Sequence, residues 1–280
     1  MKRNYQKIIL VVLDGLRPDT VTLARMPHLF GLAAEGWQAD AAITVTPSIT
    51  VAALTSLATG LTPAEHGVTR PGLPPLARLP GLRPLPRELR QLGVSTTVHL
   101  PVLGAGARWI AGALLRVGGV TRLCARGTTP ASVVEFARQQ VEGNRHREFV
   151  VVYLNDTDVA GHAWGWMSGP YLQAAARLDR AVARLAPLAR ARDTLLLVTA
   201  DHGGGGVDPR DHDALHPLNR RVPLIAAGAG IAAGQAGRLP THLLDIPPTV
   251  LNGFGGTSPA QYAGRVLHEA FSEELVPACG

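Results

Sequence analysis

The stretch IILVVLD at residues 8–14 decides the fold, because six apolar residues run without interruption and then stop on an aspartate. An uninterrupted apolar run is typical of a strand with both faces covered, as in a parallel sheet flanked by helices. Two later segments repeat this design, VVVYLNDTD at 150–158 and LLLVTADHGGGG at 195–206. Each ends on carboxylates or imidazoles, so we expect a parallel sheet to gather metal-ligand side chains at the carboxyl ends of its strands.

A fourth segment, WQADAAITVTPSIT at 37–50, ends on a hydroxyl group and leads into a helix pattern over residues 51–59. Thr50 is expected at the N-cap of this helix, where free N–H groups and the helix dipole favour negative charge. Such a position suits both an ionised nucleophile and a phosphoryl group, and Ser48 is the competing hydroxyl. Together the four segments predict a hydrolase whose hydroxyl nucleophile is activated by a bimetallic site.

Strand-like and helix-like patterns alternate along the chain, which predicts an α/β fold with a mostly parallel central sheet and helices on both faces. Further strands are expected at 94–100, 148–154, 194–200 and 222–227, and helices at 26–35, 105–117, 130–141 and 171–188. The Pro- and Gly-rich stretch 69–86 is expected to be an irregular loop, and the segment after Asp245 a short helix. No repeat or linker divides the sequence, so residues 1–280 are expected to form one domain.

Composition places the chain among soluble globular proteins, with 46% hydrophobic and 17% charged residues. No stretch approaches the ~20 apolar residues of a membrane helix. The first apolar run ends on Asp14 and lacks a cleavage site of small residues, so it is interpreted as a strand and not as a signal peptide. Cys124 and Cys279 match no metal or redox spacing, and free thiols indicate a reducing compartment, with cytoplasm as the expectation.

The chain is basic, with a formal charge of +6, which would favour an anionic partner. Its basic residues are almost all arginines, with lysine only at positions 2 and 7, and they are scattered along the sequence. A nucleic-acid groove would instead gather them with interleaved aromatic residues. The sequence therefore favours a small anionic substrate over nucleic acid or a membrane, and it carries no signal for oligomeric state.

Asp158 and His162 form the clearest ligand pair, because carboxylate oxygen and imidazole nitrogen are usual ligands of Zn²⁺. Their four-residue spacing brings both within reach of one ion on a turn or helical segment. Asp156 competes as a carboxylate at the same strand end, and Asn155 is a candidate cap or substrate donor.

Asp201 and His202 would point to opposite faces of an extended strand, but on a turn they can converge. The four glycines that follow permit such a turn. Beyond them lie three further candidates for completing a ligand set, Asp211, His212 and His216.

Taken together, these residues resemble the alkaline phosphatase superfamily, and most closely its nucleotide pyrophosphatase/phosphodiesterase-like branch. The motifs that carry the resemblance follow the family's order along the chain. They are VVLDGLRPD (11–19), MPHLFGLAAEG (26–36), TPSITVAALTSLATGLTPAEHGV (46–68), YLNDTDVAGHAWG (153–165), VTADHGG (198–204), HPLNRRVPLIAAGAGI (216–231) and HLLDIPPTVL (242–251).

The resemblance implies two divalent metal ions, Zn²⁺ with Mn²⁺ as an alternative, and cleavage of a phosphodiester or pyrophosphate bond through a phosphothreonine. One ion would be held by Asp14, Asp201 and His202 with Thr50 as the nucleophile, and the other by Asp158, His162 and His212. For the last ligand the family's spacing fits His212 better than His216. The family usually has His-Gly there, whereas this chain has His212 between two aspartates.

A second departure concerns the substrate. The phosphodiesterase branch often has an asparagine three residues after the nucleophile, and this chain has Ala53. The phosphate donor would then be Asn155 or the backbone N–H groups that open the helix. Alternatives at the same centre are a phosphomonoesterase, a phosphonate hydrolase or a phosphomutase, and a catalytically inactive metal- or nucleotide-binding relative is a further one. A sulfatase is disfavoured because Cys/Ser-x-Pro-x-Arg is absent around Thr50, and a G-x-S-x-G serine hydrolase because that motif is absent.

Overall fold

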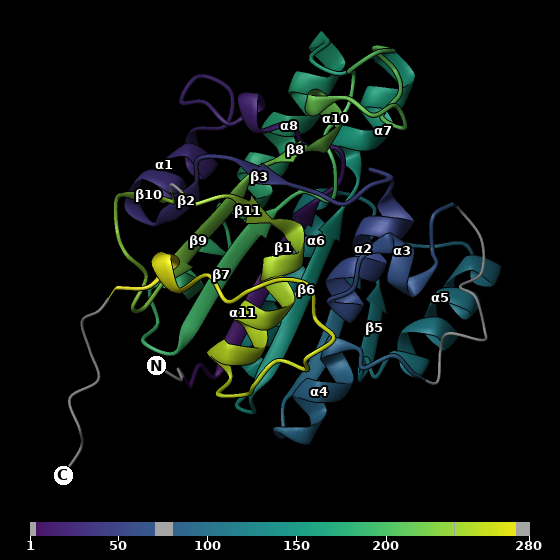
Figure 1. Cartoon of the computed structure of the whole chain (residues 1–280). Coiled ribbons are helices and arrows are strands. Elements are labelled where there is room, and N and C mark those ends of the chain that lie inside the picture. The colour runs from purple at the N-terminus through teal and green to yellow at the C-terminus, as the bar shows by residue number, and fades with distance from the viewer. Residues whose placement is uncertain (1–3, 71–80, 238, 273–280) are drawn as a thin grey trace.

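The computed structural model describes residues 4–70, 81–237 and 239–272. Its main sheet has eight strands in the order β10-β2-β9-β7-β1-β6-β4-β5 (Figure 1). They are β1 (Lys7–Leu13), β2 (Trp37–Ala39), β4 (Ser95–Leu100), β5 (Arg122–Ala125), β6 (Glu148–Leu154), β7 (Thr194–Thr199), β9 (Leu224–Gly228) and β10 (Gln235–Gly237). The five strands from β7 to β5 run parallel to their neighbours, and β9 runs antiparallel to β7. The predicted mostly parallel α/β fold is therefore confirmed.

Helices cover both faces of this sheet, as Figure 1 shows. The covering helices are α1 (Pro27–Glu35), α6 (Pro130–Gly143) and α8 (Gly169–Val182) on one face, and α2 (Thr50–Thr59), α4 (Leu85–Gln91) and α11 (Ile246–Gly253) on the other. The remaining helices are η1 (Pro18–Thr20), α3 (Pro63–His66), α5 (Ala105–Val117), α7 (Asp156–Trp164), α9 (Ala186–Ala189), α10 (Pro217–Arg220), η3 (Leu243–Asp245) and η4 (His268–Ala270). Every residue of β1 and β7 is buried, as expected for strands covered on both sides.

A second, three-stranded sheet lies beside the carboxyl edge of the main one. Its order is β11-β3-β8, with β3 (Ala42–Ile43) between β8 (Arg221–Val222) and β11 (Thr241–His242). The chain leaves β3 toward the start of α2, and β8 directly follows α10. This small sheet therefore fixes the segment that delivers Thr50.

Most predicted elements are found within two residues of their expected bounds, and the strand at 148–154 and the helix at 105–117 match at both ends. The expected helix 171–188 is instead α8 followed by a break and α9. Pro187, near the start of α9, has no N–H to continue α8, which explains the break. The strand expected at 222–227 is likewise split between β8 and β9.

The loop expected at 69–86 was too long, because α4 begins at Leu85 with Pro86 in its first turn. Residues 71–80 of that stretch lie outside the described residues. Strand β5 was missed, since a four-residue edge strand with an exposed arginine has no strong apolar pattern. The single-domain expectation stays a prediction. Cys124 is a free thiol, and Cys279 lies outside the described residues.

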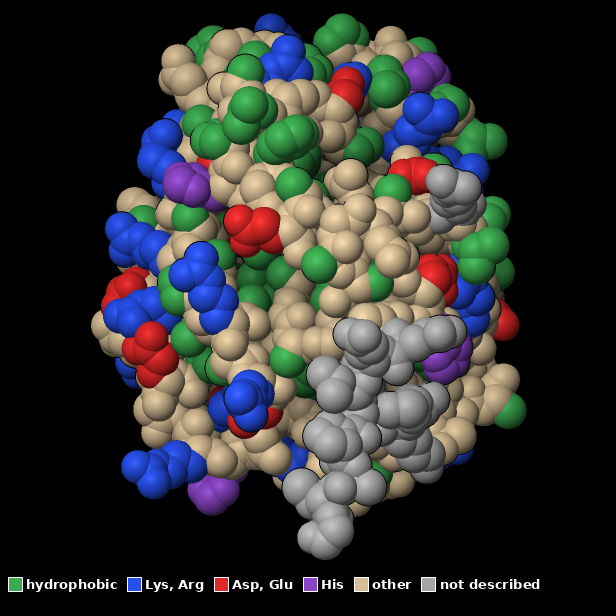
Figure 2. All heavy atoms as spheres, turned by 90° about the vertical axis from the view of Figure 1, so that its left-hand side faces the viewer, with side chains coloured by type: hydrophobic (Ala, Val, Ile, Leu, Met, Phe, Trp, Pro, Cys, Tyr) green, Lys and Arg blue, Asp and Glu red, His purple; other side chains and the backbone are tan. Residues whose placement is uncertain are grey.

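Basic side chains lie scattered among acidic ones on the face shown in Figure 2. In the part of the chain that the structure describes, no helix has both the length and the apolar character needed to cross a bilayer.

Candidate metal centre

Three adjacent strands deliver the first ligand candidates. Strands β7, β1 and β6 are parallel neighbours, so the residues that follow them meet at one edge of the sheet. Asp14 follows β1, and its N–H donates to Leu154 O at 2.9 Å, which continues the β1–β6 ladder. Asp201 and His202 follow β7. The side chains of Asp14, Asp201 and His202 are all buried, with residue exposures of 2%, 0% and 0%.

Thr50 reaches the same place from the small sheet and not from a strand of the main one. It is the first residue of α2, and Ile49, with extended backbone angles, is the N-cap. The expected capping role of Thr50 was therefore wrong by one position, a common uncertainty at helix ends. The shift leaves its hydroxyl free of capping, and Thr50 Oγ1 lies 3.2 Å from His202 Nε2.

The Nε2 atom of His202 lies at the middle of the first group. It is 3.1 Å from Asp14 Oδ1, 3.7 Å from Asp201 Oδ2 and 4.0 Å from Asp158 Oδ1. The side chains of this group thus come from the end of β1, the end of β7 and helix α7, which follows β6. The predicted convergence of Asp201 and His202 on one turn is thus found, with His202 N–H donating to Asp201 Oδ1 at 3.0 Å.

A second group forms around Asp158, which lies in the first turn of α7 and not at the end of β6. One helical turn later, His162 Nε2 is 3.4 Å from Asp158 Oδ1, as the four-residue spacing predicts. His212 Nε2 is 3.8 Å from the same oxygen, and the rings of His212 and His202 stack at 3.8 Å between centroids. Asp158 therefore stands between the two groups.

The ligand atoms of each group are close enough to bind one ion. Two sets, Asp14/Asp158/His202 and Asp158/His162/His212, each place their ligand atoms within 4.8 Å of one another. The second set is the one predicted for the second ion. In the first set Asp158 takes the place expected for Asp201, whose Oδ2 lies beside His202 but completes neither set.

The three histidines are held in one tautomer. The Nδ1 atoms of His162, His202 and His212 lie 2.9, 2.8 and 2.8 Å from the carbonyl oxygens of Arg210, Gly203 and Ser48. A carbonyl oxygen can only accept, so each Nδ1 carries the proton and donates it. Each neutral ring therefore turns an unprotonated Nε2 toward the carboxylates, the arrangement that metal-ligating histidines usually show.

Three buried carboxylate oxygens in the centre have no hydrogen-bond partner among the described residues: Asp14 Oδ1, Asp158 Oδ1 and Asp201 Oδ2. Leaving a buried carboxylate oxygen without a partner is costly, and a cation removes that cost. The donor set, carboxylate oxygens with imidazole nitrogens, suits divalent ions such as Zn²⁺. The residues present therefore fit a metal centre.

The electrostatics of the metal-free centre agree with this fit. Burial, and then the charge of Asp158, raise the pKa of Asp14 to about 7. Burial also raises the pKa of Asp201 well above its ordinary value, with the neighbouring Asp14 as the next cause. The pKa of His212 is lowered by burial and by His202. Burial and neighbouring carboxylates both disfavour the charged forms of Asp14 and Asp201, and a bound cation would oppose both effects.

Two glycines allow this crowding. Gly15 has a φ of +69°, and an added Cβ would lie 2.9 Å from the Cα of Asp158. Gly204, in the predicted glycine turn, faces Trp166 so closely that a Cβ would lie 2.0 Å from the indole ring. The glycine run thus serves close packing between the loop after β7 and the segment after α7.

Sequence reasoning missed the residues that support the ligands. The Tyr153 hydroxyl donates to Asp14 Oδ2, Thr157 Oγ1 donates to the Asp14 carbonyl, and Trp166 Nε1 donates to Gly15 O at 2.8 Å. Burial, followed by the charge of Asp14, raises the pKa of Tyr153, so its phenol stays protonated and remains a donor. The available signal was the polar group of Tyr153, which follows the apolar residues 149–152 of the strand.

Ser48, the competing hydroxyl, has a supporting position. Its Oγ donates to His212 O at 2.9 Å while its carbonyl accepts from His212 Nδ1. This reciprocal pair joins the loop before α2 to the loop after β7. The structure thus brings Thr50, and not Ser48, to the ligand cluster.

His216, the alternative ligand, is held in the opposite tautomer. Its Nδ1 accepts from Leu218 N–H at 3.2 Å, so the proton of the neutral ring is on Nε2. It belongs to neither group of ligand atoms found in the described residues. His212 is therefore the histidine that the geometry places with Asp158 and His162.

The other candidates lie at the margin of the centre. Asp156 lies 3.9 Å from Arg177, and Asp211 accepts from the N–H groups of His212 and Asp213, shaping that turn. Asn155 is the N-cap residue of α7 but makes no side-chain capping bond, which leaves its amide available. Ala53 is buried within α2 and offers no side-chain donor.

Solved structures with the same fold cover nearly the whole chain. A phosphonate monoester hydrolase from Silicibacter pomeroyi matches with a TM-score of 0.69 at 17% identity, over 100% of this chain and 78% of that one. An alkaline phosphatase superfamily protein from Vibrio parahaemolyticus matches with a TM-score of 0.75 at 17% identity, over 95% and 70%. A putative sulfatase from Bacteroides fragilis reaches 0.74 at 17% identity, over 98% and 79%. At these identities the matches show the fold.

Curated relatives match only in part. A 2,3-bisphosphoglycerate-independent phosphoglycerate mutase from Cereibacter sphaeroides is 30% identical over 44% of this chain and 24% of its own length. Its counterpart from a Cyanothece species is 29% identical over 52% and 29%. The chain thus spans about a quarter of the length of these relatives.

The family model described as type I phosphodiesterase / nucleotide pyrophosphatase matches residues 8–71 and 123–239, well over half of the chain. These ranges contain every residue of the ligand cluster and Thr50. The protein thus has the fold of the alkaline phosphatase superfamily of metal-dependent hydrolases and mutases, and the chain belongs to its type I phosphodiesterase/nucleotide pyrophosphatase family.

Proposed function

We propose that this protein is a phosphoesterase that cleaves phosphodiester or pyrophosphate bonds with Thr50 as the nucleophile. The observation that carries this proposal is the place of the Thr50 hydroxyl, 3.2 Å from His202 Nε2 and at the first residue of α2. Free N–H groups at the start of a helix are suited to phosphoryl oxygens. These N–H groups can donate hydrogen bonds to a phosphate oxygen, which the side chain of Ala53 cannot do.

The proposed ligands divide between two ions. Asp14, Asp201 and His202 would hold one, with Asp158, His162 and His212 holding the other, and Asp158 lies near enough to both to reach either. Zn²⁺ is our first assignment because mixed imidazole and carboxylate ligands suit it, and Mn²⁺ is the alternative. Bound ions would supply the positive charge that stabilises an ionised hydroxyl and the oxygens of the transferring phosphoryl group.

The protein's own residues would carry the reaction in two steps. Thr50 Oγ1 forms a bond to phosphorus while the bond from phosphorus to the leaving oxygen breaks, and the proton of the Thr50 hydroxyl is transferred to the leaving oxygen. Phosphorus then links Thr50 to the remaining organic group of the diester. Water cleaves the bond between Thr50 and phosphorus, which releases the phosphate monoester and restores the Thr50 hydroxyl. Asn155, at the start of α7, is proposed to donate its amide to a phosphate oxygen.

The test uses Thr50→Ala and Thr50→Ser with Zn²⁺- or Mn²⁺-loaded protein. We expect Thr50→Ala to abolish hydrolysis of bis(p-nitrophenyl) phosphate while its metal content stays at the wild-type value, and Thr50→Ser to retain activity. Acid-quenched wild-type protein should carry a p-nitrophenylphosphoryl group on the peptide that contains Thr50. An active Thr50→Ala variant would overturn the assignment of the nucleophile.

Substrate class is tested on the same preparation. The diester should be turned over faster than p-nitrophenyl phosphate and p-nitrophenyl phenylphosphonate, and a reversed order would establish a monoesterase or a phosphonate hydrolase instead. Inertness toward all three, in protein that binds no metal, would make this chain an inactive relative.

A second candidate, transfer of the phosphoryl group to another hydroxyl, is favoured by the mutase names of the curated relatives. It predicts that excess alcohol captures phosphate from the phosphothreonine in competition with water. ³¹P NMR of the products distinguishes the two, because hydrolysis of a diester yields only the phosphate monoester, whereas transfer yields a new diester that contains the added alcohol.

A further inference from the structure

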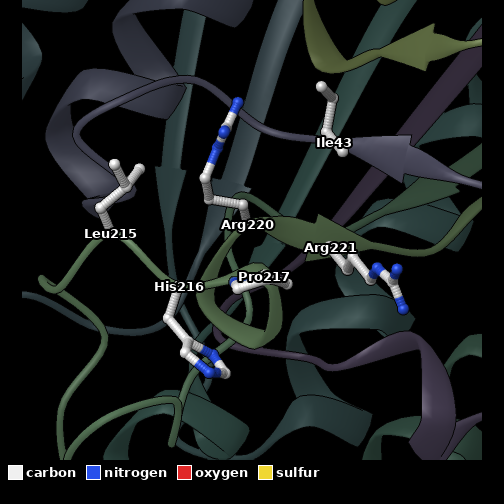
Figure 3. A pocket seen from close by; sticks show the side chains of 6 residues that line it. All are labelled: Ile43, Leu215, His216, Pro217, Arg220 and Arg221. Carbon is white, nitrogen blue, oxygen red and sulfur yellow. The ribbon is translucent and has the colours of Figure 1, made fainter.

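A cavity of about 310 Å³ opens between β3 and α10, outside the ligand cluster. Its walls are Ile43, Leu215, His216, Pro217, Arg220 and Arg221 (Figure 3). In Figure 3 the Arg220 guanidinium and the His216 ring lie at opposite ends, with Pro217 between them. The lining thus combines apolar contact surface with cationic and N–H donor groups, and no acidic residue belongs to it.

Arg220 is the strongest feature of this cavity. Its Nε atom is buried without a hydrogen-bond partner, and among the described residues no carboxylate lies within 4 Å of its guanidinium. Arg220 as a whole is only partly buried, so the unsatisfied group is the Nε–H donor, and a buried donor without a partner is costly. A bound oxyanion would satisfy it, and Arg is the side chain best suited to doing so.

His216 adds a second donor to the lining. Since its Nδ1 accepts from Leu218 N–H, the neutral ring presents an Nε2–H group. The same tautomer that excludes His216 from the metal cluster makes it a donor to an anion.

Both walls of the cavity are tied to the reaction centre. On one side, Gly203 N–H donates to Asn219 O at 2.8 Å and Gly204 N–H to Leu218 O at 3.1 Å, which fixes α10 to the loop directly after His202. On the other side, Thr44 N–H donates to Arg220 O at 2.9 Å, in the segment between β3 and Thr50. A molecule in the cavity would thus lie against the two segments that position His202 and Thr50.

We propose that this cavity is the subsite for the organic group of the substrate, and that this group carries a second oxyanion, a carboxylate or a further phosphate. Arg220 binds that oxyanion, and Ile43, Leu215 and Pro217 contact the carbon chain. This inference rests on the proposed function, because it assumes that a phosphorus group occupies the centre beside Thr50.

Binding tests this subsite without requiring turnover. The probes are ethylphosphonate, 2-carboxyethylphosphonate and ethane-1,2-bisphosphonate, titrated by calorimetry into metal-loaded protein. We expect 2-carboxyethylphosphonate and ethane-1,2-bisphosphonate, the doubly anionic probes with a second anionic group, to bind at least about 10-fold more tightly than ethylphosphonate. The reason is that hydrogen bonds to charged groups are stronger than those between neutral groups. The carboxylate and bisphosphonate probes separate the two sources of the oxyanion.

Three variants locate the effect. Arg220→Met keeps the aliphatic stem and should lower the affinity for both doubly anionic probes by about 10- to 100-fold, while ethylphosphonate binding changes less than about 3-fold. His216→Asn keeps an acceptor for Leu218 N–H but removes the ring donor, and should give a smaller selective loss. Arg180→Met, on an exposed position of α8, is the matched control and should change nothing.

The outcomes separate the two proposals. Equal affinities of wild-type protein for all three probes, or equal losses for all three in Arg220→Met, would overturn the subsite. Selective binding in a protein that hydrolyses no ester would support the subsite and overturn the proposed hydrolysis.

Discussion

Strands β1 and β6 carry a buried carboxylate cluster at each end, and the two clusters are built in opposite ways. At the amino ends, Lys7 of β1 pairs in register with Glu148 of β6. At the carboxyl ends, Asp14 follows β1 and Tyr153 lies one residue before the end of β6. The same two strands thus place acidic side chains in the interior twice, about one strand length apart.

The cluster at the amino ends is satisfied by the protein itself. Glu148 Oε1 accepts from Thr97 and Gln140, both at 2.6 Å, and Oε2 accepts from Asn144 at 2.7 Å and lies 3.6 Å from Lys7 Nζ. Each carboxylate oxygen therefore has donors, and the charge has a partner. Such a network holds strands and helix together and leaves no capacity for a ligand.

The cluster at the carboxyl ends is left incomplete, with one unpartnered oxygen each on Asp14, Asp158 and Asp201. Three histidines turn unprotonated Nε2 atoms toward these oxygens, and no lysine or arginine is paired with them in the described residues. The number of hydrogen-bond and ion-pair partners thus distinguishes a structural carboxylate from a carboxylate suited to binding a cation. Burial alone does not distinguish them, because both kinds are buried.

The largest effect is expected from Asp158→Asn, because Asp158 belongs to both groups of ligand atoms. We expect metal content to fall and phosphoester hydrolysis to drop by roughly 10³-fold or more. Asp156→Asn is the matched control, two residues away on the same helix and 3.9 Å from Arg177. Metal analysis and steady-state rates give the readout. Equal losses in the two variants would contradict the assignment of Asp158.

Glu148→Ala should give the opposite pattern, with metal content unchanged and the free energy of unfolding lowered by about 3 kcal/mol. The substitution removes three hydrogen bonds to a charge and leaves the buried Lys7 without its carboxylate partner. Urea denaturation measures the change. Glu142→Ala, which breaks an exposed pair with Arg138, is the control and should cost less than about 1 kcal/mol.

Asp14→Asn completes the comparison at the other end of β1. In chelated protein we expect its free energy of unfolding to equal or exceed that of the wild type, because the substitution removes a buried carboxylate that has no Lys or Arg partner and whose Oδ1 has no donor. A loss of stability as large as that of Glu148→Ala would mean that the two clusters do not differ in kind.

His99, on β4 near the satisfied cluster, sets a pH dependence. Burial lowers its pKa from 6.5 to about 4, so the folded protein keeps the ring neutral where the unfolded chain protonates it. The unfolded state therefore binds more protons between pH 6.5 and 4, and stability falls as pH falls through that window, by about 3 kcal/mol. His99→Phe should flatten this slope in denaturation curves, and exposed His146→Asn should leave it unchanged. An unaltered slope in His99→Phe would assign the acid sensitivity to other groups.

Sequence alone could predict the features that depend on local pattern. The apolar runs at 8–14 and 195–200 predicted buried parallel strands, and the residues that follow them predicted the ligand cluster. The four-residue spacing of Asp158 and His162 predicted that their side chains are in contact, since residues four apart on a helix are neighbours. The family's spacing favoured His212 over His216, but the backbone group that faces each ring, which sets its tautomer, is reported by no sequence pattern.

The supporting groups lay beyond sequence for the same reason. Tyr153 and Asp14 meet because of the register between β1 and β6, and Ser48 and His212 meet across two loops. Both contacts join residues more than a hundred positions apart. The position of Thr50 was missed by one residue because Ile49, which has no capping side chain, precedes the helix.

The smallest effect is expected from Tyr153→Phe, which links the two clusters through the shared strand β6. The phenol donates to Asp14 Oδ2, so its loss leaves a second oxygen of that carboxylate without a donor but keeps every proposed metal ligand. Removing such a supporting donor should weaken metal affinity by about 10-fold. Activity titrated against free Zn²⁺ should shift to higher metal concentration and recover at saturation. A loss of activity that saturating metal cannot restore would place Tyr153 in the reaction itself, and an unshifted titration would mean that Asp14 is oriented by its backbone alone.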